Sequence, residues 1–330
     1  MTDAPNGVPA GAQGGPSWLV DDILRVEDLL LRTAGASGQP LVAEPSLHLL
    51  KAGGKRLRPA LVLLSSHAGE SGRRATDLAA AAIELVHIAT LYHDDVLDET
   101  ETRRGVPTTH AKWGTEVAVL AGDYLFACGS ALGAEASGEV PGILARAIAA
   151  VCEGQIVETG SMNDPDRTPE QYLDTIRLKT AALFGAACDL GAATSDAGPD
   201  RRAALMVYGE SLGLAFQVVD DLLDLIGDPR ITGKEPGTDL REGVFTIPVL
   251  IGCQRDPSLA RRLASGDRQL GSVLPSLEAS GALTAALDIA CEHGRRAEGA
   301  LAELPDEEWA ASLRTIITGV LAQVPDVSPV

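Results

Sequence analysis

Three aspartates lie close together at the end of an apolar stretch, in the segment LYHDDVLDET at residues 91–100. On a helix, Asp94 and Asp98 are about 40° apart around the axis, and Asp95 is about 60–100° from each. Carboxylates at a helix C-terminus meet the negative end of the helix dipole, and like charges four residues apart repel each other. The cluster therefore predicts that something positive is held there, although a solvated helix end is the simpler alternative.

The same spacing recurs in FQVVDDLLD, where Asp220, Asp221 and Asp224 end a second apolar stretch. Two such clusters, each at the C-terminal end of a buried helix, favour a shared site if the fold brings them face to face. Carboxylate oxygens suit Mg²⁺, which in such sites usually also binds substrate phosphate. Six carboxylates carry a charge of about −6, which about three Mg²⁺ ions would balance.

In a chain this acidic, functional basic residues should be few and local, and several basic residues stand near the aspartates or in glycine-rich segments. They are Lys55, Arg56 and Arg58 in GGKRLRP, Arg103 and Arg104 directly after the first aspartates, Lys179 in RLKTAALF and Lys234 in ITGKEPGTD. Arginine binds phosphate oxygens through two N–H groups at once, and lysine acts as a point charge. We interpret these residues as cations for diphosphate, with an ordinary solvated loop as the alternative for residues 53–59.

The histidines and cysteines show no metal-binding spacing. His87 lies seven residues before Asp94 on the same helix face, so substrate contact and core packing both remain open for it. His93 lies on another face and is expected to pack against the core. The five cysteines are scattered and lack a C-x-x-C motif, which favours buried reduced thiols. No Walker-type or Rossmann-type glycine motif is present.

The elements that must position these residues read as helices separated by short Gly/Pro-rich breaks, without convincing alternating strands. Two long segments, around residues 76–99 and 202–228, are apolar nearly all round and are expected in the middle of a many-helix bundle. The predicted class is all-α, with one helical domain over residues 18–325 and tails at 1–17 and 326–330. The expected helices are 18–35, 41–52, 58–69, 75–100, 115–134, 139–160, 169–193, 199–227, 246–254, 257–265, 270–279, 281–303 and 306–323.

Composition narrows the range of partners. The net charge of −19 argues against nucleic acid and against docking on anionic lipid. The N-terminus lacks the basic and apolar regions of a signal peptide. No run reaches the roughly 18 uninterrupted apolar residues of a membrane span. These features predict a soluble, cytoplasmic protein without a transmembrane segment.

The chain resembles the trans-polyprenyl diphosphate synthases, most of all those with medium or long products. The resemblance rests on five motifs taken together: GGKRLRP, DDVLDETETRRG, KTAALF, FQVVDDLLD and GKEPGTDLREG. The motifs occur in the same order and at similar intervals, over about residues 20–325. The resemblance implies an all-α bundle around a central cavity, usually homodimeric. It also implies a Mg²⁺-dependent prenyltransferase, in which an allylic diphosphate ionises and isopentenyl diphosphate attacks the resulting cation.

The resemblance assigns roles residue by residue. Asp94, Asp98 and Asp220 match metal ligands, with Asp95, Asp221 and Asp224 completing the two clusters. The residues that match those holding the allylic diphosphate are Arg103, Lys179, Thr180, Gln217 and Lys234. Those that match the isopentenyl diphosphate site are Lys55, Arg58, His87 and Arg104, and Arg56 belongs to the same basic motif. Where the family commonly reads DLxxGKxT this chain reads DLREGVFT, so Val244 replaces a phosphate-binding lysine and puts one allylic contact in doubt.

In this family, the residues four and five positions before the first aspartate set much of the product length. Here they are Thr90 and Ala89, both small, which predicts a product of C30 or longer. Tyr92 lies about 60° from Ala89 around the helix, so it borders the growing chain or packs elsewhere. Geranylgeranyl or farnesyl diphosphate is the alternative product, since Val86 or a neighbouring helix could close the tunnel lower down.

Two other classes of protein fit less well. A class I terpene cyclase would keep the first cluster but lack GGKRLRP and the second DDxxD. A non-catalytic partner subunit of a heteromeric synthase would typically lose one aspartate cluster, and this chain keeps both.

Overall fold

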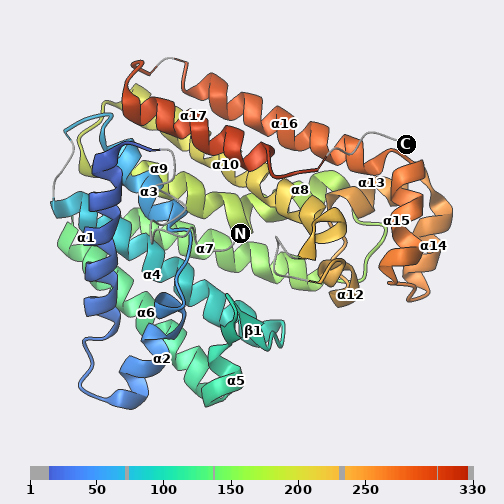
Figure 1. Ribbon diagram of the computed structural model, residues 1–330, viewed down its shortest axis with the longest axis horizontal. Helices are drawn as coiled ribbons and strands as arrows, with labels where there is room; N and C mark the ends of the chain where they lie inside the picture. The colour runs from blue at the N-terminus through green and yellow to red at the C-terminus, as the bar shows by residue number, and fades with distance from the viewer. Residues whose placement is uncertain (1–14, 71–73, 137, 230–234, 303, 326–330) are drawn as a thin grey trace.

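The computed structural model describes residues 15–70, 74–136, 138–229, 235–302 and 304–325, which form a helical bundle (Figure 1). The four longest helices are α4 (Arg74–Leu97), α6 (Thr115–Ala136), α7 (Val140–Gly160) and α10 (Pro199–Ile226). The remaining helices of the N-terminal half are α1 (Ser17–Ala34), α2 (Pro40–Lys51), α3 (Leu57–Ser66), α5 (Thr109–Trp113), α8 (Pro169–Ile176) and α9 (Ala182–Thr194). Those of the C-terminal half are α12 (Thr238–Glu242), α13 (Ile247–Arg255), α14 (Pro257–Ala264), α15 (Leu270–Ala279), α16 (Ala282–Ala300) and α17 (Glu308–Leu321).

Two short elements interrupt the helical pattern near the predicted site. A π-helical segment, η2 (Arg177–Ala181), joins α8 to α9. An antiparallel hairpin of β1 (Thr102–Arg103) and β2 (Val106–Pro107) follows α4, with Thr102 opposite Pro107. The predicted helix over 169–193 is therefore confirmed as one continuous helical stretch, but its middle is π-helical, which hydrophobic periodicity does not distinguish from α-helix. The hairpin, α5 and α12 were also missed, since each is too short for a periodic signal.

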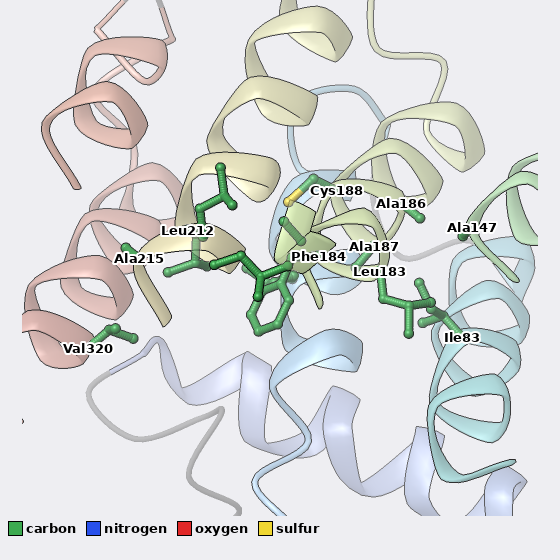
Figure 2. Packing of buried hydrophobic residues seen from close by; sticks show 14 of the residues in the cluster. Ile83, Ala147, Leu183, Phe184, Ala186, Ala187, Cys188, Leu212, Ala215 and Val320 are labelled. Carbon is green, nitrogen blue, oxygen red and sulfur yellow. The ribbon is translucent and has the colours of Figure 1, made fainter. Parts of the chain in front are cut away.

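The core is one continuous cluster of buried side chains, which extends from Leu19 in α1 to Val320 in α17. The short helix α9 lies at its centre and packs against α3, α4, α7 and α10. Figure 2 shows α9 side chains surrounded by Ile83 of α4, Ala147 of α7 and Leu212 of α10. The all-α bundle with two buried long helices is confirmed. Of the predicted tails at 1–17 and 326–330, residues 1–14 and 326–330 lie outside the described residues, and α1 already begins at Ser17.

By length and composition alone, α4, α6 and α7 would qualify as membrane spans, in contrast to the prediction from uninterrupted apolar runs. Within the bundle, other helices cover 78% of the apolar window of α4. They cover only 39% and 33% of the corresponding windows of α6 and α7. Large exposed side chains on these two helices include Leu120 and Ile156. The outer surface of α6 and α7 is thus more apolar than a solvated helix pair requires.

Candidate active site

The first aspartate cluster lies at the C-terminal end of α4. Asp94 is within the helix, and Asp98 directly follows its last residue, Leu97. Both carboxylates face Lys179 of η2. Burial raises the pKa of Asp94 to about 6, although the charge of Lys179 opposes that rise. The pKa of Asp98 is also raised by burial and opposed by Lys179. These two aspartates therefore share one cation before any substrate is present.

Asp95, the middle aspartate, lies deeper than its neighbours. Its side chain is 1% exposed and forms an ion pair with Arg103 of β1. Burial raises the pKa of Asp95, and Arg103 opposes this effect. The hairpin after α4 thus brings Arg103 back over the helix end. Arg103 already has a carboxylate partner, so its predicted contact with the allylic diphosphate remains a prediction.

The π-helix η2 places Lys179 between α7 and the first aspartates. Single π turns occur often at functional sites because they redirect one side chain. The ammonium group of Lys179 forms an ion pair with Glu158 of α7. Gly154 lies one turn before Glu158, and a Cβ there would come within 2.5 Å of the Lys179 amide nitrogen. Sequence reasoning missed Glu158, because a lone glutamate in an apolar helix carries no motif.

The second cluster lies at the C-terminal end of α10. Asp220 is exposed, whereas Asp221 is 1% exposed and accepts a hydrogen bond from Gln217 Nε2 at 3.0 Å. Thr180 donates from Oγ1 to Gln217 Oε1 at 2.8 Å. Tyr172 of α8 faces the same Asp221 carboxylate and makes a hydrogen-bonding contact with it. The pKa of Asp221 is raised well above its ordinary value, mainly by burial and to a smaller extent by the charge of nearby Asp239.

Adjacent residues of η2 connect the two clusters. Lys179 faces Asp94 and Asp98, while Thr180 contacts Gln217 of α10. The two aspartate clusters therefore lie on either side of the Lys179–Thr180 pair. The sequence favoured a shared site if the fold brings the clusters face to face, and these contacts link both clusters to one short segment of the chain.

Asp224, the third aspartate of the second motif, contacts the backbone of α12. Its Oδ1 accepts from the Thr238 amide at 3.1 Å, and its Oδ2 lies 3.3 Å from the Asp239 amide. It therefore caps the start of α12 rather than standing free beside Asp220. Val244, which replaces the usual lysine, is half-buried against the core. Lys234 lies outside the described residues.

A basic cluster lies where the GGKRLRP segment enters α3. The Arg58 guanidinium lies 4.7 Å from the ring centre of Phe184, and Lys55 Nζ lies 5.8 Å from that of Phe216. The two phenylalanine rings are 5.4 Å apart. Because Phe216 directly precedes Gln217, the basic cluster adjoins the second aspartate cluster. Burial lowers the pKa of Arg58 to about 10, and its Nε makes no hydrogen bond.

Arg104 and His87 complete the basic cluster. Arg104 donates from Nη1 to the carbonyl oxygens of Gly53 and Leu49. A Cβ at Gly54 would lie 2.8 Å from this Nη1 and from Arg56 Nη1, so a larger residue would have to displace one of the two guanidinium groups. Burial, and then the charges of Arg58 and Arg104, lower the pKa of His87 well below 6.5. At neutral pH the ring is uncharged, and one of its nitrogens can donate to an anion.

Arg56, in the same motif, has protein partners for most of its guanidinium. Its Nε and Nη2 donate to the two carboxylate oxygens of Glu27 at 2.5 and 2.7 Å. Its Nη1 donates to Glu84 Oε1 at 3.2 Å, and its Nη2 also donates to the Leu50 carbonyl at 3.1 Å. The side chain is 2% exposed. Direct substrate binding by Arg56 remains a prediction, but these contacts favour a structural role.

The residues predicted to set product length lie on α4, near the first cluster. Ala89 is fully buried, and Thr90 is 9% exposed with its hydroxyl bonded to the His87 carbonyl at 2.7 Å. Tyr92 packs toward α2, where its hydroxyl donates to the Pro45 carbonyl at 2.6 Å. His93 lies against α6, with Nε2 3.1 Å from the Val119 carbonyl oxygen. Ala89 and Thr90 thus present only small groups beneath Asp94.

The acidic side chains fit a metal that shares its ligands with a substrate. Among the described residues, no three Asp, Glu, His or Cys side chains are grouped closely enough to hold a metal alone. Asp95 Oδ2 and Asp221 Oδ2 are buried and make no well-formed hydrogen bond. Mg²⁺ typically binds one or two carboxylates, completes its shell with water and phosphate oxygens, and so matches this donor set.

Comparison with known proteins agrees with the geometry. A family profile described as polyprenyl synthetase matches residues 39–269. The chain is 38% identical over 303 residues to the nonaprenyl diphosphate synthase of Mycobacterium tuberculosis, covering 89% of this chain and 90% of the relative.

Two solved structures share the fold over nearly their whole length. The decaprenyl diphosphate synthase of Rhodobacter capsulatus superposes with a TM-score of 0.89 at 36% identity, covering 96% of this chain and 99% of that one. The geranylgeranyl pyrophosphate synthase of Corynebacterium glutamicum, complexed with calcium and isoprenyl diphosphate, superposes with a TM-score of 0.82 at 35% identity, covering 95% and 99%.

Proposed function

The chain belongs to the polyprenyl synthetase family of prenyltransferases, and on that premise we propose that it extends an allylic diphosphate with isopentenyl diphosphate to a trans-polyprenyl diphosphate of C30 or longer. The observation that supports the proposal is that the Lys179–Thr180 pair is linked to both aspartate clusters, while the basic cluster adjoins the second of them through Phe216. In this proposal one diphosphate would bind between the aspartate clusters, and a second would bind at the basic cluster. This arrangement matches a reaction between two diphosphate esters.

The residues that would hold Mg²⁺ are Asp94 and Asp98 on α4 and Asp220 on α10, with about three ions per site. Bound there with the allylic diphosphate, the metal would supply positive charge to the leaving group. The protein adds Lys179, and Arg103 and Gln217 are near enough to orient the same diphosphate. These groups stabilise the negative charge that grows on the leaving oxygens as the C–O bond breaks.

The basic cluster would hold isopentenyl diphosphate with its double bond directed toward the allylic carbon. Arg58, Arg104 and Lys55 supply charge, and neutral His87 supplies a donor. The new C–C bond forms when the double bond attacks the allylic cation, and a proton then leaves. The apolar surroundings protect the cation from water. We assign no protein base, since the released diphosphate can accept the proton.

Product length supplies a direct prediction. Replacing Ala89 by Phe should shorten the product while short allylic starters still turn over, because the ring would occupy space one turn beneath Asp94. Overpacking at this buried site should cost about 1–3 kcal/mol of stability. Ala89→Ser is the matched control and should leave the product distribution unchanged. Chromatographic sizing of the products measures the effect, and an unaltered distribution in Ala89→Phe would show that this residue does not border the chain.

The proposed reaction is tested by incubating the protein with Mg²⁺, isopentenyl diphosphate and each of dimethylallyl, geranyl, farnesyl and geranylgeranyl diphosphate. Elongation to C30 or beyond is the expected result. A product that stops at C20 would favour the geranylgeranyl diphosphate alternative. No elongation from any starter would favour a non-catalytic partner subunit, although both aspartate clusters are kept. The cytoplasmic location remains a prediction.

We also propose that two copies associate through the outer faces of α6 and α7. Leu120 is 66% and Ile156 is 72% exposed there, and neither helix is otherwise well covered. A dimer would remove this apolar surface from water.

Changing both Leu120 and Ile156 to Glu is expected to convert a dimer into a monomer, because burying two charges per subunit would oppose association. Light scattering during size-exclusion chromatography measures the mass. Met206→Glu is the control, since Met206 is 43% exposed on α10, a helix that packs mainly against α16 and α9. A mass unaffected by the double change would place the interface elsewhere, and vesicle binding lost in the double variant would point to lipid instead.

A further inference from the structure

Helix α1 has a carboxylate beneath the basic cluster, although no motif and no predicted site residue lies in that helix. Glu27 receives both the Nε and the Nη2 of Arg56, in a bidentate ion pair at 2.5 and 2.7 Å. Arg56 also donates to Glu84 of α4 and to the Leu50 carbonyl. Arginine has five N–H groups, and four are thus used by the protein. Little of this guanidinium is left for a substrate.

The position of Arg56 in the chain makes this contact important for its neighbours. Its backbone is left-handed, with φ 51° and ψ 36°, and it immediately precedes α3. Lys55 directly precedes Arg56 in the chain, and Arg58 follows two residues after it. Gly54 is wedged between Arg56 and Arg104, each with a guanidinium nitrogen 2.8 Å from where a Cβ would be. Any displacement of Arg56 would therefore move the cations around it.

We propose that Glu27 is a positioning residue for the basic cluster, the proposed site of isopentenyl diphosphate, which is the homoallylic substrate. Glu27 would act through Arg56 to fix the backbone from which Lys55 and Arg58 extend. The inference rests on the proposed role of that basic cluster. Glu27 itself touches no reacting atom. Its side chain is 25% exposed, whereas that of Arg56 is 2% exposed, so Glu27 closes the outer end of the contact.

A simpler explanation is that Glu27 only ties α1 to the rest of the bundle. The chain offers a matched ion pair for this comparison, because Arg25 of α1 contacts Asp77 of α4 at 3.2 Å. Both ion pairs join α1 to residues outside it. Only the one with Glu27 reaches the GGKRLRP segment. Asp77→Asn should therefore reproduce any effect of loosening α1 without disturbing the basic cluster.

The test compares Glu27→Gln, Arg56→Lys and Asp77→Asn with the unchanged enzyme. Arg56→Lys keeps the charge and loses the planar fork. We expect Glu27→Gln and Arg56→Lys each to raise KM for isopentenyl diphosphate by about 10-fold, less than the roughly 100-fold that a 1 Å misplacement can cost. KM for the allylic substrate and kcat should change by no more than about twofold, because the aspartate clusters are untouched.

A binding measurement without catalysis provides the second readout. Inorganic diphosphate without Mg²⁺ should raise the melting temperature through the basic cluster, and half-maximal stabilisation should need about 10-fold more diphosphate in Glu27→Gln. Glu27→Gln in an Arg56→Lys background should add little, since both act through one contact.

The inference is overturned if Glu27→Gln matches Asp77→Asn in both readouts, or if its effect adds in full to that of Arg56→Lys. Arg58→Met separates this result from a failure of the proposed function. If Arg58→Met leaves KM for isopentenyl diphosphate unchanged, the basic cluster is not the homoallylic site. If Arg58→Met raises that KM and Glu27→Gln does not, only the role of Glu27 is wrong.

Discussion

Changing Asp94 to Asn is expected to lower kcat by about 1000-fold, since removing one preorganised charge-stabilising group costs about 100- to 1000-fold and this residue would also hold a metal. The amide keeps the size of the side chain and loses the anionic oxygen. The fold of the Asp94→Asn variant should persist, because burial already disfavours the charged form of Asp94 and raises its pKa to about 6. Initial rates at several Mg²⁺ concentrations, together with melting curves, measure both effects.

Asp77→Asn is the matched control on the same helix. Asp77 lies in the first turn of α4 and pairs with Arg25, far along the helix from Asp94. It should cost at most about 1 kcal/mol of stability, as partly exposed ion pairs do, and leave kcat unchanged. If Asp94→Asn kept more than about a tenth of the activity at saturating Mg²⁺, the assignment of the first cluster to the metal would be wrong.

Changing Arg58 to Met is expected to raise stability while raising KM for isopentenyl diphosphate by about 100-fold, since a charge-assisted hydrogen bond is worth about 1.5–3 kcal/mol. The stability gain arises because the half-buried guanidinium has no hydrogen bond at its buried Nε and no ion pair among the described residues. Burial is the main cause that lowers the pKa of Arg58 to about 10. This lowered pKa also indicates that the charge is unfavourable in the protein without substrate. Removing it should add roughly 1–3 kcal/mol to the free energy of unfolding.

The pH dependence of this gain has a definite sign. A base with a lowered pKa in the folded state destabilises that state at every pH below about 10, and the penalty disappears as the pH rises from about 10 toward 12.5. The difference in unfolding free energy between Arg58→Met and the unchanged protein should therefore be constant between about pH 6 and 9.

Arg56→Met is the contrasting variant, two positions away in the same motif. It would leave Glu27 and Glu84 without their partner, and such a loss typically costs about 3–5 kcal/mol. Chemical denaturation should thus show opposite shifts for the two arginines. A loss of stability in Arg58→Met would mean that its charge is better compensated than the contacts indicate.

The sequence was sufficient for the fold class because the signal came from long apolar helices. The aspartates of α4 and α10 were recognisable for a similar reason, since DDxxD is a local pattern at a helix end. Individual roles within a motif were harder to predict. GGKRLRP suggests three equivalent cations, yet Arg58 is unpaired at Nε while Arg56 is held by two carboxylates.

The residues that were missed share a physical cause. Glu27, Glu84 and Glu158 act on groups 29, 28 and 21 positions away in the chain, so no local spacing connects them to the site. Asp224 was assigned to a metal cluster by its spacing, but its bonds to α12 depend on where the chain returns after α10. Tertiary contacts of this kind leave no periodic trace in one sequence.

The left-handed backbone at Arg56 has a counterpart at Arg104, where φ is 52°, and at Glu99, where φ is 51°. Among the described residues, these are three of the five non-glycine positions with positive φ, and all three border the site. Such conformations cost roughly 1–2 kcal/mol each for an ordinary L-residue. A stabilisation screen guided by backbone torsion would thus choose glycine or asparagine at Arg56 and Arg104. It would relieve local strain by deleting the charges that this proposed site requires, so torsional outliers here should be protected from thermostability engineering.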